Sequence, residues 1–261
     1  MTKINREKTQ VTDKVQKLIR GAESILAFDT TGKSLSLAIL RGDRLVTLKT
    51  LNTGLQHSSK LLPAIESSLA ETNTKLEDLD ALAVTRGPGS FTGIRIGIAT
   101  ANSLAFSLNI PVIAVSSLET LAANYLQVDS LVLPAFDARG GRLFAGLFRN
   151  GLRLLEDRQF IDRELVESLV DKGYQEEKII LLGDGAPIAK ELLEGAGFKH
   201  LQKVEEGDPA NFLSAAALAY LARKVLLADP CLLGSAYKDP AQAEYCALSQ
   251  AERMHKVAGK A

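Results

Sequence analysis

Short apolar segments alternate along this chain with longer segments in which apolar residues recur every three or four positions. In one example, an apolar run from Ala81 to Val84 ends at a loop rich in glycine and proline. A helical pattern from Thr92 to Leu108 follows this loop and ends before Pro111. The pattern predicts a strand, a turn and a helix in direct succession.

The loop between this strand and this helix has the composition of an anion-binding turn. Gly87 and Gly89 allow backbone angles closed to other residues, and Ser90 or Thr92 can cap the helix. Backbone N–H groups at such a helix start attract anions. The loop is not a Walker A loop, because no Lys-Ser or Lys-Thr follows its last glycine. Nor is it a nucleophile elbow, because Pro88 stands two residues before Ser90. A plain strand-to-helix connection is the alternative interpretation.

Two segments of the chain are similar to each other. Residues 25–39 align without a gap with residues 133–147, and in both an Ala-Phe-Asp triplet is followed three residues later by glycine. Each copy alternates apolar and polar residues and then meets a glycine turn, which is typical of a hairpin. Each copy continues with a helical pattern, a short strand and a glycine loop, at 57–72, 81–84 and 87–93 and again at 162–172, 179–182 and 183–185. This order predicts a duplicated β-β-β-α-β-α unit.

A duplicated unit of this kind is the plan of the actin-like ATPases and sugar kinases, the ASKHA or RNase H-like fold. We therefore expect an α/β protein with two lobes, residues 24–127 and 128–261, each with a mixed five-stranded sheet and flanking helices. Residues 1–23 are expected to form a polar N-terminal extension with a short amphipathic helix, frayed or loosely docked, and a functional arm is the alternative.

In this architecture the aspartate loops and the glycine loops of both lobes face one cleft, where they bind phosphates and organise a cation. The expected phosphate-loop residues are Asp29, Thr30, Thr31, Gly87, Gly89, Ser90 and Asp137. Arg139 supplies bulk where the second loop should approach a phosphate. We therefore expect vestigial loops, and because a repeat indicates a fold and not an activity, function must be argued from the site.

Composition narrows the class of protein further. The chain has 261 residues, of which 46% are hydrophobic and 24% charged, as in ordinary globular proteins. Its 31 basic and 31 acidic residues balance, so the summed charge favours no dominant contact with nucleic acid. Cys231 and Cys246 form no C-x-x-C pair, which suits a reducing cytoplasm. No apolar run reaches the ~18 residues of a membrane span, and the N-terminus has no apolar signal-peptide core, so a cytoplasmic protein is expected.

Several motifs resemble one particular family. They are Ile-Leu-Ala-Phe-Asp-Thr-Thr at 25–31, Gln-His-Ser-Ser-Lys-Leu-Leu-Pro at 56–63, Asp-Leu-Asp-Ala at 78–81, the glycine loop at 84–97, Pro-Val-Ile-Ala-Val-Ser-Ser-Leu-Glu-Thr-Leu-Ala at 111–122 and Phe-Asp-Ala-Arg at 136–139. Together these segments resemble the TsaB (YeaZ) group of the TsaD family over residues 25–150. Residues 150–261 are similar to the family only loosely, and Tyr245-Cys246-Ala247 replaces its usual Tyr-Leu-Arg.

The resemblance implies a part in making threonylcarbamoyladenosine, a modified base of certain tRNAs. In that family TsaD is the transferase and holds a metal with an H-x-x-x-H pair, whose imidazoles lie on one helix face. Ser117 and Leu121 stand in the corresponding places here. Leucine cannot ligate a metal, and His57, His200 and His255 lie far apart in sequence. We therefore expect no metal site.

Other catalytic arrangements are not supported by the residues. Two carboxylate pairs, Glu66 with Glu71 and Asp78 with Asp80, lie in polar stretches and are expected on the solvated surface. His57 beside Ser58 is expected to have a capping or surface role. We expect a non-catalytic scaffold subunit without cofactor, although weak ATP or ADP binding at the loops stays open. The alternative is an ATP-dependent kinase or a metal-dependent, glycoprotease-like hydrolase of the same fold.

A non-catalytic subunit needs a binding surface, and two helical patterns supply candidates. In the helix after the glycine loop, small residues recur at every fourth position, so another helix could approach this stripe closely. The preceding helix has a stripe of larger apolar residues at helical spacing. The expected partner-binding residues are Leu61, Leu62, Ile65, Leu69, Gly93, Gly97, Ala101 and Ala105. Packing of the small stripe inside this chain is the alternative.

The resemblance implies a heterodimer with TsaD, recruitment of the ATPase TsaE, a homodimer when alone and an indirect or minor contact with tRNA. On this basis Gly97→Leu should leave the monomer folded and abolish pairing.

Overall fold

The computed structural model describes residues 12–21, 23–52, 56–161, 163–234 and 240–244. Within these ranges the chain forms two compact units, and each is described by itself. The first unit is made of the described residues among 1–86, 92–115 and 213–243, and the second of those among 87–91, 116–212 and 244–261.

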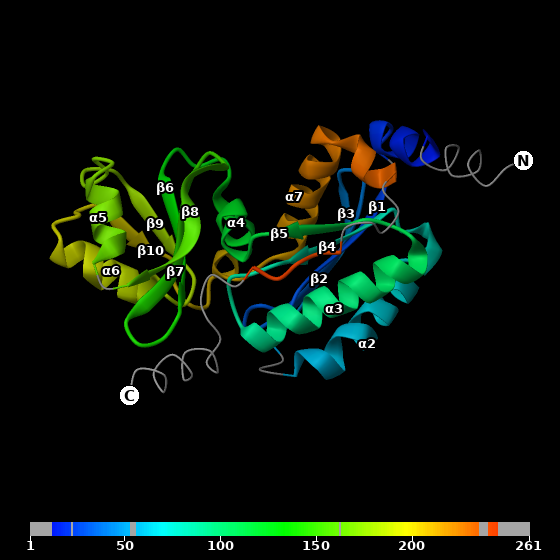
Figure 1. Ribbon diagram of the computed structural model, residues 1–261, viewed down its shortest axis with the longest axis horizontal. Helices are drawn as coiled ribbons and strands as arrows, with labels where there is room; N and C mark the ends of the chain where they lie inside the picture. Colours follow the sequence, from blue (N-terminus) through cyan, green and yellow to red (C-terminus); the bar gives the residue numbers. More distant parts are fainter. Residues whose placement is uncertain (1–11, 22, 53–55, 162, 235–239, 245–261) are drawn as a thin grey trace, which may run out of the picture. The chain divides into compact units, whose positions relative to one another are not determined.

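The first unit is built on a mixed five-stranded sheet with strand order β3-β2-β1-β4-β5 (Figure 1). Its strands are β1 (Ser24–Asp29), β2 (Leu35–Arg41), β3 (Arg44–Leu51), β4 (Ala81–Thr85) and β5 (Val112–Val115). The first three strands form an antiparallel meander, whereas β4 and β5 run parallel to β1. Phe28, near the end of β1, pairs with Leu37 on one side and with Val84 on the other.

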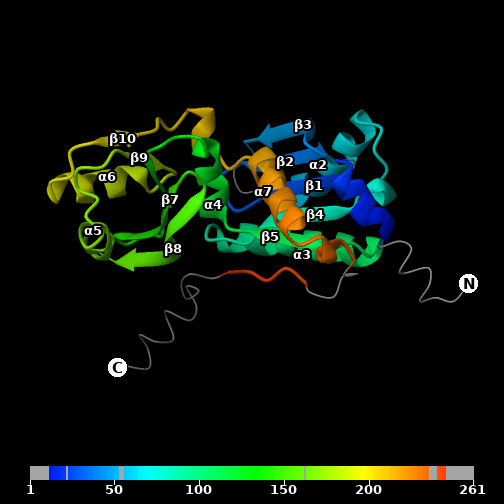
Figure 2. The same cartoon turned by 90° about the horizontal axis from the view of Figure 1, so that it is seen from above.

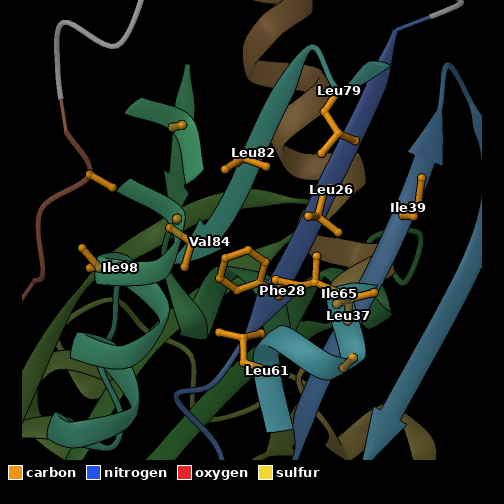
Figure 3. Close-up of a cluster of buried hydrophobic side chains, with 14 of the residues drawn as sticks. Leu26, Phe28, Leu37, Ile39, Leu61, Ile65, Leu79, Leu82, Val84 and Ile98 are labelled. Atoms are coloured by element: carbon orange, nitrogen blue, oxygen red, sulfur yellow. The ribbon is translucent and has the colours of Figure 1, made fainter. Parts of the chain in front are cut away.

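Helices cover both faces of this sheet. Helices α2 (His57–Glu71) and α3 (Phe91–Leu108) lie on one face, and α7 (Ala215–Ala228) lies on the other (Figures 1 and 2). Between the sheet and the first two helices, Phe28, Leu61, Ile65, Val84 and Ile98 belong to one buried cluster (Figure 3). Because both faces are covered, every residue of β1 is buried, as is usual for a strand in the parallel part of a sheet.

The second unit repeats the same arrangement. Its strands are β6 (Leu131–Asp137), β7 (Arg142–Arg149), β8 (Leu152–Ile161), β9 (Ile179–Leu182) and β10 (Leu201–Lys203), in the order β10-β9-β6-β7-β8. Helices α5 (Glu164–Val170) and α6 (Ala186–Gly195) share a buried cluster with this sheet, and α4 (Ser117–Ala122) contacts β6 and β7. Short 3₁₀ turns occupy Leu76–Asp78, Ala123–Tyr125, Pro209–Asn211 and Pro230–Gly234.

The two sheets have the same topology, because an antiparallel meander is followed in each by two strands parallel to the first. The predicted duplication is therefore confirmed. The chain has the duplicated actin-like fold, with a mixed five-stranded sheet and flanking helices in each unit.

The units differ from the predicted lobes at α7. This helix lies late in the chain, yet it contacts β1, β2, β4 and β5 of the first unit. Its first residue, Ala215, donates a backbone hydrogen bond of 2.9 Å to the Ser36 hydroxyl on β2. Helix α4, in contrast, precedes residue 128 but belongs to the second unit. A boundary drawn by position along the chain misses both exchanges, because the apolar stripe of a helix does not tell which sheet it covers.

The described part of the N-terminal extension, residues 12–21, contains the expected short helix at 12–19. The side chain of Leu18 in this helix is buried. Residues 1–11 lie outside the described residues. No helix in the described ranges is long and apolar enough to cross a membrane.

Candidate functional site

The first predicted phosphate loop begins where β1 ends, at Asp29. The carboxyl group of Asp29 is fully buried. Its Oδ1 accepts hydrogen bonds from the backbone N–H of Thr31 at 3.1 Å, from the Thr31 hydroxyl at 2.6 Å and from the Thr85 hydroxyl. Its Oδ2 is buried without a hydrogen-bond partner among the described residues. Burial raises the pKa of Asp29 above its ordinary value, against the opposing effect of these donors.

Thr30 ties the same loop to helix α3. Its hydroxyl is buried and donates a hydrogen bond of 2.7 Å to the carbonyl oxygen of Gly93 in the first turn of α3. A Cβ atom at Gly97 would lie 2.6 Å from the Thr30 hydroxyl oxygen and 3.3 Å from a methyl carbon of Val84. Glycine at 97 therefore allows α3 to approach the ends of β1 and β4 closely.

The predicted stripe of small residues faces the interior of the first unit. Gly93, Gly97, Ala101 and Ala105 are all buried, and the two alanines belong to the apolar cluster of Figure 3. The assignment of these four residues to a partner surface is therefore wrong. The spacing of small residues correctly indicated a close approach, but the approaching element is the chain's own sheet.

The predicted apolar stripe of α2 is divided between interior and surface. Leu61 and Ile65 are buried in the same cluster, and Leu69 packs against it from the edge. The assignment of Leu61 and Ile65 to a partner surface is therefore wrong as well. Leu62 is half exposed and stays a candidate for contact with a partner.

The outward side of α3 carries residues that the sequence analysis did not select. Phe106 is 72% exposed, Phe91 is exposed by more than a third, and Arg95 and Ala99 between them are exposed. These four residues lie one or two helical turns apart and form the outer stripe of α3. The sequence already indicated this surface, because Phe106 is a large apolar residue that shares one side of the helix with the polar residue Asn102 and is followed by the polar residue Ser107.

The glycine loop makes backbone contacts at its start. The backbone N–H of Arg86 donates to the carbonyl of Val115 at 2.9 Å within the first unit. In the second unit the carbonyl of Gly87 accepts from the backbone N–H of Ser117 at 2.9 Å. Gly87 and Gly89 have positive φ, 109° and 157°, as their predicted role in a tight turn requires. Ser90 is half-buried at the end of this loop.

The second predicted phosphate loop follows β6 and is exposed at Asp137. The Asp137 carboxylate accepts from the backbone N–H of Arg139 at 2.7 Å, and its own N–H donates to Asp184 at 3.1 Å. Arg139 has a positive φ of 63°, and its carbonyl accepts from the Arg142 guanidinium at 3.0 Å. The two predicted loops lie in different units, so their meeting at one cleft stays a prediction.

Helix α4 carries the positions that correspond to the metal-binding histidines in the resemblance. Ser117 and Leu121 are both fully buried. At the start of α4 the sequence analysis missed a polar network. Asp157 accepts from the Ser116 hydroxyl and pairs with Arg153, and Arg153 also pairs with Glu119 at 2.8 Å.

Asp157 at the centre of this network lies on β8. Its pKa is raised by burial, and the hydrogen bond from Ser116 and the charge of Arg153 oppose that effect. Ser116 also accepts the backbone N–H of Glu119 and so caps α4. The network fixes the start of α4 against β8 through charge-assisted hydrogen bonds.

Two further sequence predictions concern titratable residues. His57 is buried, and its Nε2 lies 3.1 Å from the carbonyl oxygen of Gly32, so the expected surface role is wrong. Asp80 is also buried, contrary to the expected solvated surface, whereas Asp78 and Glu71 are exposed.

Within the ranges that the structure describes, no three or more His, Cys, Asp or Glu side chains gather where they could hold a metal ion.

The duplicated sheets and the aspartate loops at their strand ends place the chain in the actin-like class of proteins. A family model described as TsaD, tRNA N6-adenosine threonylcarbamoyltransferase, matches residues 52–252. The tRNA threonylcarbamoyladenosine biosynthesis protein TsaB of Bacillus subtilis is 38% identical over 175 residues, which are 66% of this chain and 75% of that protein. Its namesake in Escherichia coli is 40% identical over 122 residues, 46% of this chain and 52% of that protein.

A solved structure supports the same relationship. YeaZ from Pseudomonas aeruginosa superposes with a TM-score of 0.69 at 25% identity, over 85% of this chain and 100% of that chain. The chain belongs to the TsaD family, and the resemblance to its TsaB (YeaZ) group is confirmed.

Proposed function

We propose that this chain takes part in tRNA threonylcarbamoyladenosine biosynthesis as a non-catalytic scaffold subunit. In this proposal it pairs with the transferase TsaD, supports the active conformation of TsaD and helps to recruit the ATPase TsaE. The family match and the names of the relatives support the pathway. The scaffold role is argued from the residues of the site. The chain works in the cytoplasm, and its contact with tRNA is indirect or minor.

The observation that carries the scaffold role is the internal bonding of the Asp29 loop. A carboxylate that organises a cation needs oxygen atoms directed at the ion. Asp29 is fully buried, and its Oδ1 is occupied by donors from Thr31 and Thr85. The Thr30 hydroxyl likewise donates a hydrogen bond to the carbonyl oxygen of Gly93. These side chains hold the loop and α3 in place, and of the two carboxylate oxygens of Asp29 only Oδ2 has no hydrogen-bond partner among the described residues. A single buried oxygen does not make the ligand set that a nucleotide-bound cation needs.

The positions on α4 support the same role. Ser117 and Leu121 are buried, and the corresponding residues of the transferase are the metal-binding histidines implied by the resemblance. A buried leucine supplies packing and no metal ligand. We therefore propose that the chain contributes a surface to the complex and leaves the transfer chemistry to TsaD.

The outer stripe of α3, together with Leu62 of α2, is the best-supported surface for TsaD. Large exposed aromatic residues are common at the centres of protein interfaces, where they bury much apolar area. Phe106 is the most exposed large apolar side chain in the described residues. When TsaD is absent, the same stripe in a second copy can form a homodimer, in which each residue of the patch meets the same patch.

Size-exclusion chromatography with light scattering tests this proposal on the purified chain, alone and mixed with TsaD from the same species. We expect a homodimer alone and a one-to-one heterodimer in the mixture. Phe106→Ser should weaken the heterodimer at least tenfold, as expected for an aromatic anchor. Leu152→Ser, at a residue of the second unit that is 69% exposed, is the matched control and should leave binding unchanged.

Two outcomes would contradict the proposal. Failure of the chain to bind TsaD would remove the scaffold role and lead to calorimetry with ATP and ADP, which tests the kinase or hydrolase alternative. Normal binding by Phe106→Ser would retain the role and move the surface away from α3.

A further inference from the structure

The N-terminal helix, residues 12–19, is packed onto the first unit. Leu18 is only 1% exposed, whereas the neighbouring Ile19 is 68% exposed. One face of this short helix is therefore buried and the other is solvated. A helix of this length is not stable by itself in water, so its packing must hold it in place.

A buried carboxylate contacts the N-terminal helix where the inner strands β1 and β4 begin. Asp80 directly precedes β4 and is buried, and Lys17 places its ammonium 3.2 Å from both carboxylate oxygens. The same carboxylate accepts the backbone N–H of Ser24 at 2.9 Å, and the Asp80 N–H donates to the Ser24 carbonyl at 2.8 Å. Lys17 thus fastens the helix to the first residues of β1 and to the start of β4.

A second ion pair joins the end of this segment to α7. Glu23 is fully buried and pairs with the guanidinium of Arg223, 200 residues further along the chain. The other carboxylate oxygen of Glu23 has no hydrogen-bond partner in the described part of the chain. Arg223 is therefore the cation that compensates a charge buried in the first unit.

The turn between β2 and β3 closes against the same segment. Gly42 donates its N–H to the Glu23 carbonyl at 2.8 Å, and a Cβ atom at Gly42 would overlap the backbone of Gly21. On the other side of this turn, the hydroxyl of Tyr220 on α7 donates to the carbonyl of Asp43 at 2.9 Å. A Cβ atom at Gly21 would lie 3.7 Å from the guanidinium of Arg223.

We propose that residues 12–21, together with Glu23 and Ser24, act as a brace that holds α7 on the sheet of the first unit. The brace is fastened by Leu18 and by Lys17 with Asp80 at one end, and by Glu23 with Arg223 at the other. Release of the helix would loosen Glu23 and so remove the ionic partner of α7. This proposal is independent of the proposed role in tRNA modification, and it makes the extension an integral element of the first unit.

Amide hydrogen exchange of the full chain distinguishes a brace from a passive appendage. Leu18→Ala opens a cavity under the helix, and Ile19→Ala removes an exposed side chain from the same turn. We expect Leu18→Ala to accelerate exchange at residues 12–21 and at the α7 amides of residues 219–228, by about tenfold or more. Ile19→Ala should change neither segment. Faster exchange confined to residues 12–21 would overturn the proposal.

A milder pair of variants serves if Leu18→Ala prevents folding. Lys17→Met removes the ion-pair partner of Asp80, whereas Arg20→Met removes an exposed cation from the end of the same segment. Lys17→Met should accelerate exchange in α7 at least twofold to threefold, as expected for a partly exposed ion pair. Arg20→Met should not accelerate it. Equal effects of the two variants, or no effect of Lys17→Met on α7, would overturn the proposal.

Discussion

The missing side chain at Gly97 determines how closely α3 can approach the strands beneath it. The Thr30 hydroxyl occupies the space that a Cβ would need, and it is held there by its hydrogen bond to Gly93. A glycine in the middle of a helix lowers helix stability by about 1 kcal/mol relative to alanine. Here that loss is offset by close packing of helix and sheet.

Gly97→Ala should therefore destabilise the protein, although alanine is the better helix former. We expect a net loss of about 1 kcal/mol or more, because overpacking and the displaced Thr30 outweigh the gain in propensity. Gly195→Ala is the matched control, since a Cβ at this helical glycine meets no atom within 4 Å. Thermal unfolding of both variants measures the effect. A Gly97→Ala protein as stable as the wild type would contradict this account of the close packing at Gly97.

Asp29 makes stability depend on pH in the direction opposite to that of an ordinary ion-paired acid. Its folded-state pKa is raised by burial, so folding favours the protonated carboxyl. The stabilisation is present below the unfolded pKa and is lost as pH rises through the folded pKa. Relative to Asp29→Asn, the wild-type chain should lose unfolding free energy as the pH rises from the ordinary pKa of an aspartate to the raised folded-state pKa of Asp29. Urea midpoints across this range test the sign, and a difference that does not vary with pH would contradict it.

Helix α7 shows how one element depends on a charge from a distant part of the chain. Arg223 is mostly buried and pairs with the fully buried Glu23. Arg223→Met should cost about 3–5 kcal/mol, because it leaves the Glu23 carboxylate buried without a cation. Adding Glu23→Gln to this variant should recover part of the loss. Urea unfolding of the single and double variants measures the coupling, and purely additive losses would show that the pair acts as two separate contacts.

Most elements could be predicted from the periodicity of the sequence. The strand expected at 179–182 is β9, and the helices expected at 57–72 and from Thr92 to Leu108 are α2 and α3 with shifts of one residue. What periodicity could not supply is the neighbour of each face. Small residues in α3 indicate a close approach whether the approaching group is a partner helix or the Thr30 hydroxyl. In the same way, a buried Asp80 looks like a surface carboxylate until the N-terminal helix brings Lys17 beside it.

At the scale of the whole molecule, the first unit needs a helix from the far end of the chain. Helix α7 covers one face of a sheet whose β1 and β4 strands are buried on both sides. A fragment of residues 1–127 lacks this helix and should not unfold cooperatively. Residues 1–115 joined by a flexible linker to residues 213–244 should do so, because both faces are then covered. Circular dichroism during urea unfolding compares the two fragments, and a cooperative transition for residues 1–127 would show that α7 is dispensable.

The late position of α7 has a consequence for synthesis on the ribosome. The five strands of the first sheet are translated by Val115, but the helix that covers one of its faces begins only at Ala215. At usual translation rates the nascent sheet waits on the order of ten seconds with an apolar face uncovered. The first unit is thus begun first and completed last, and during that interval the uncovered face of its sheet makes the growing chain prone to aggregation.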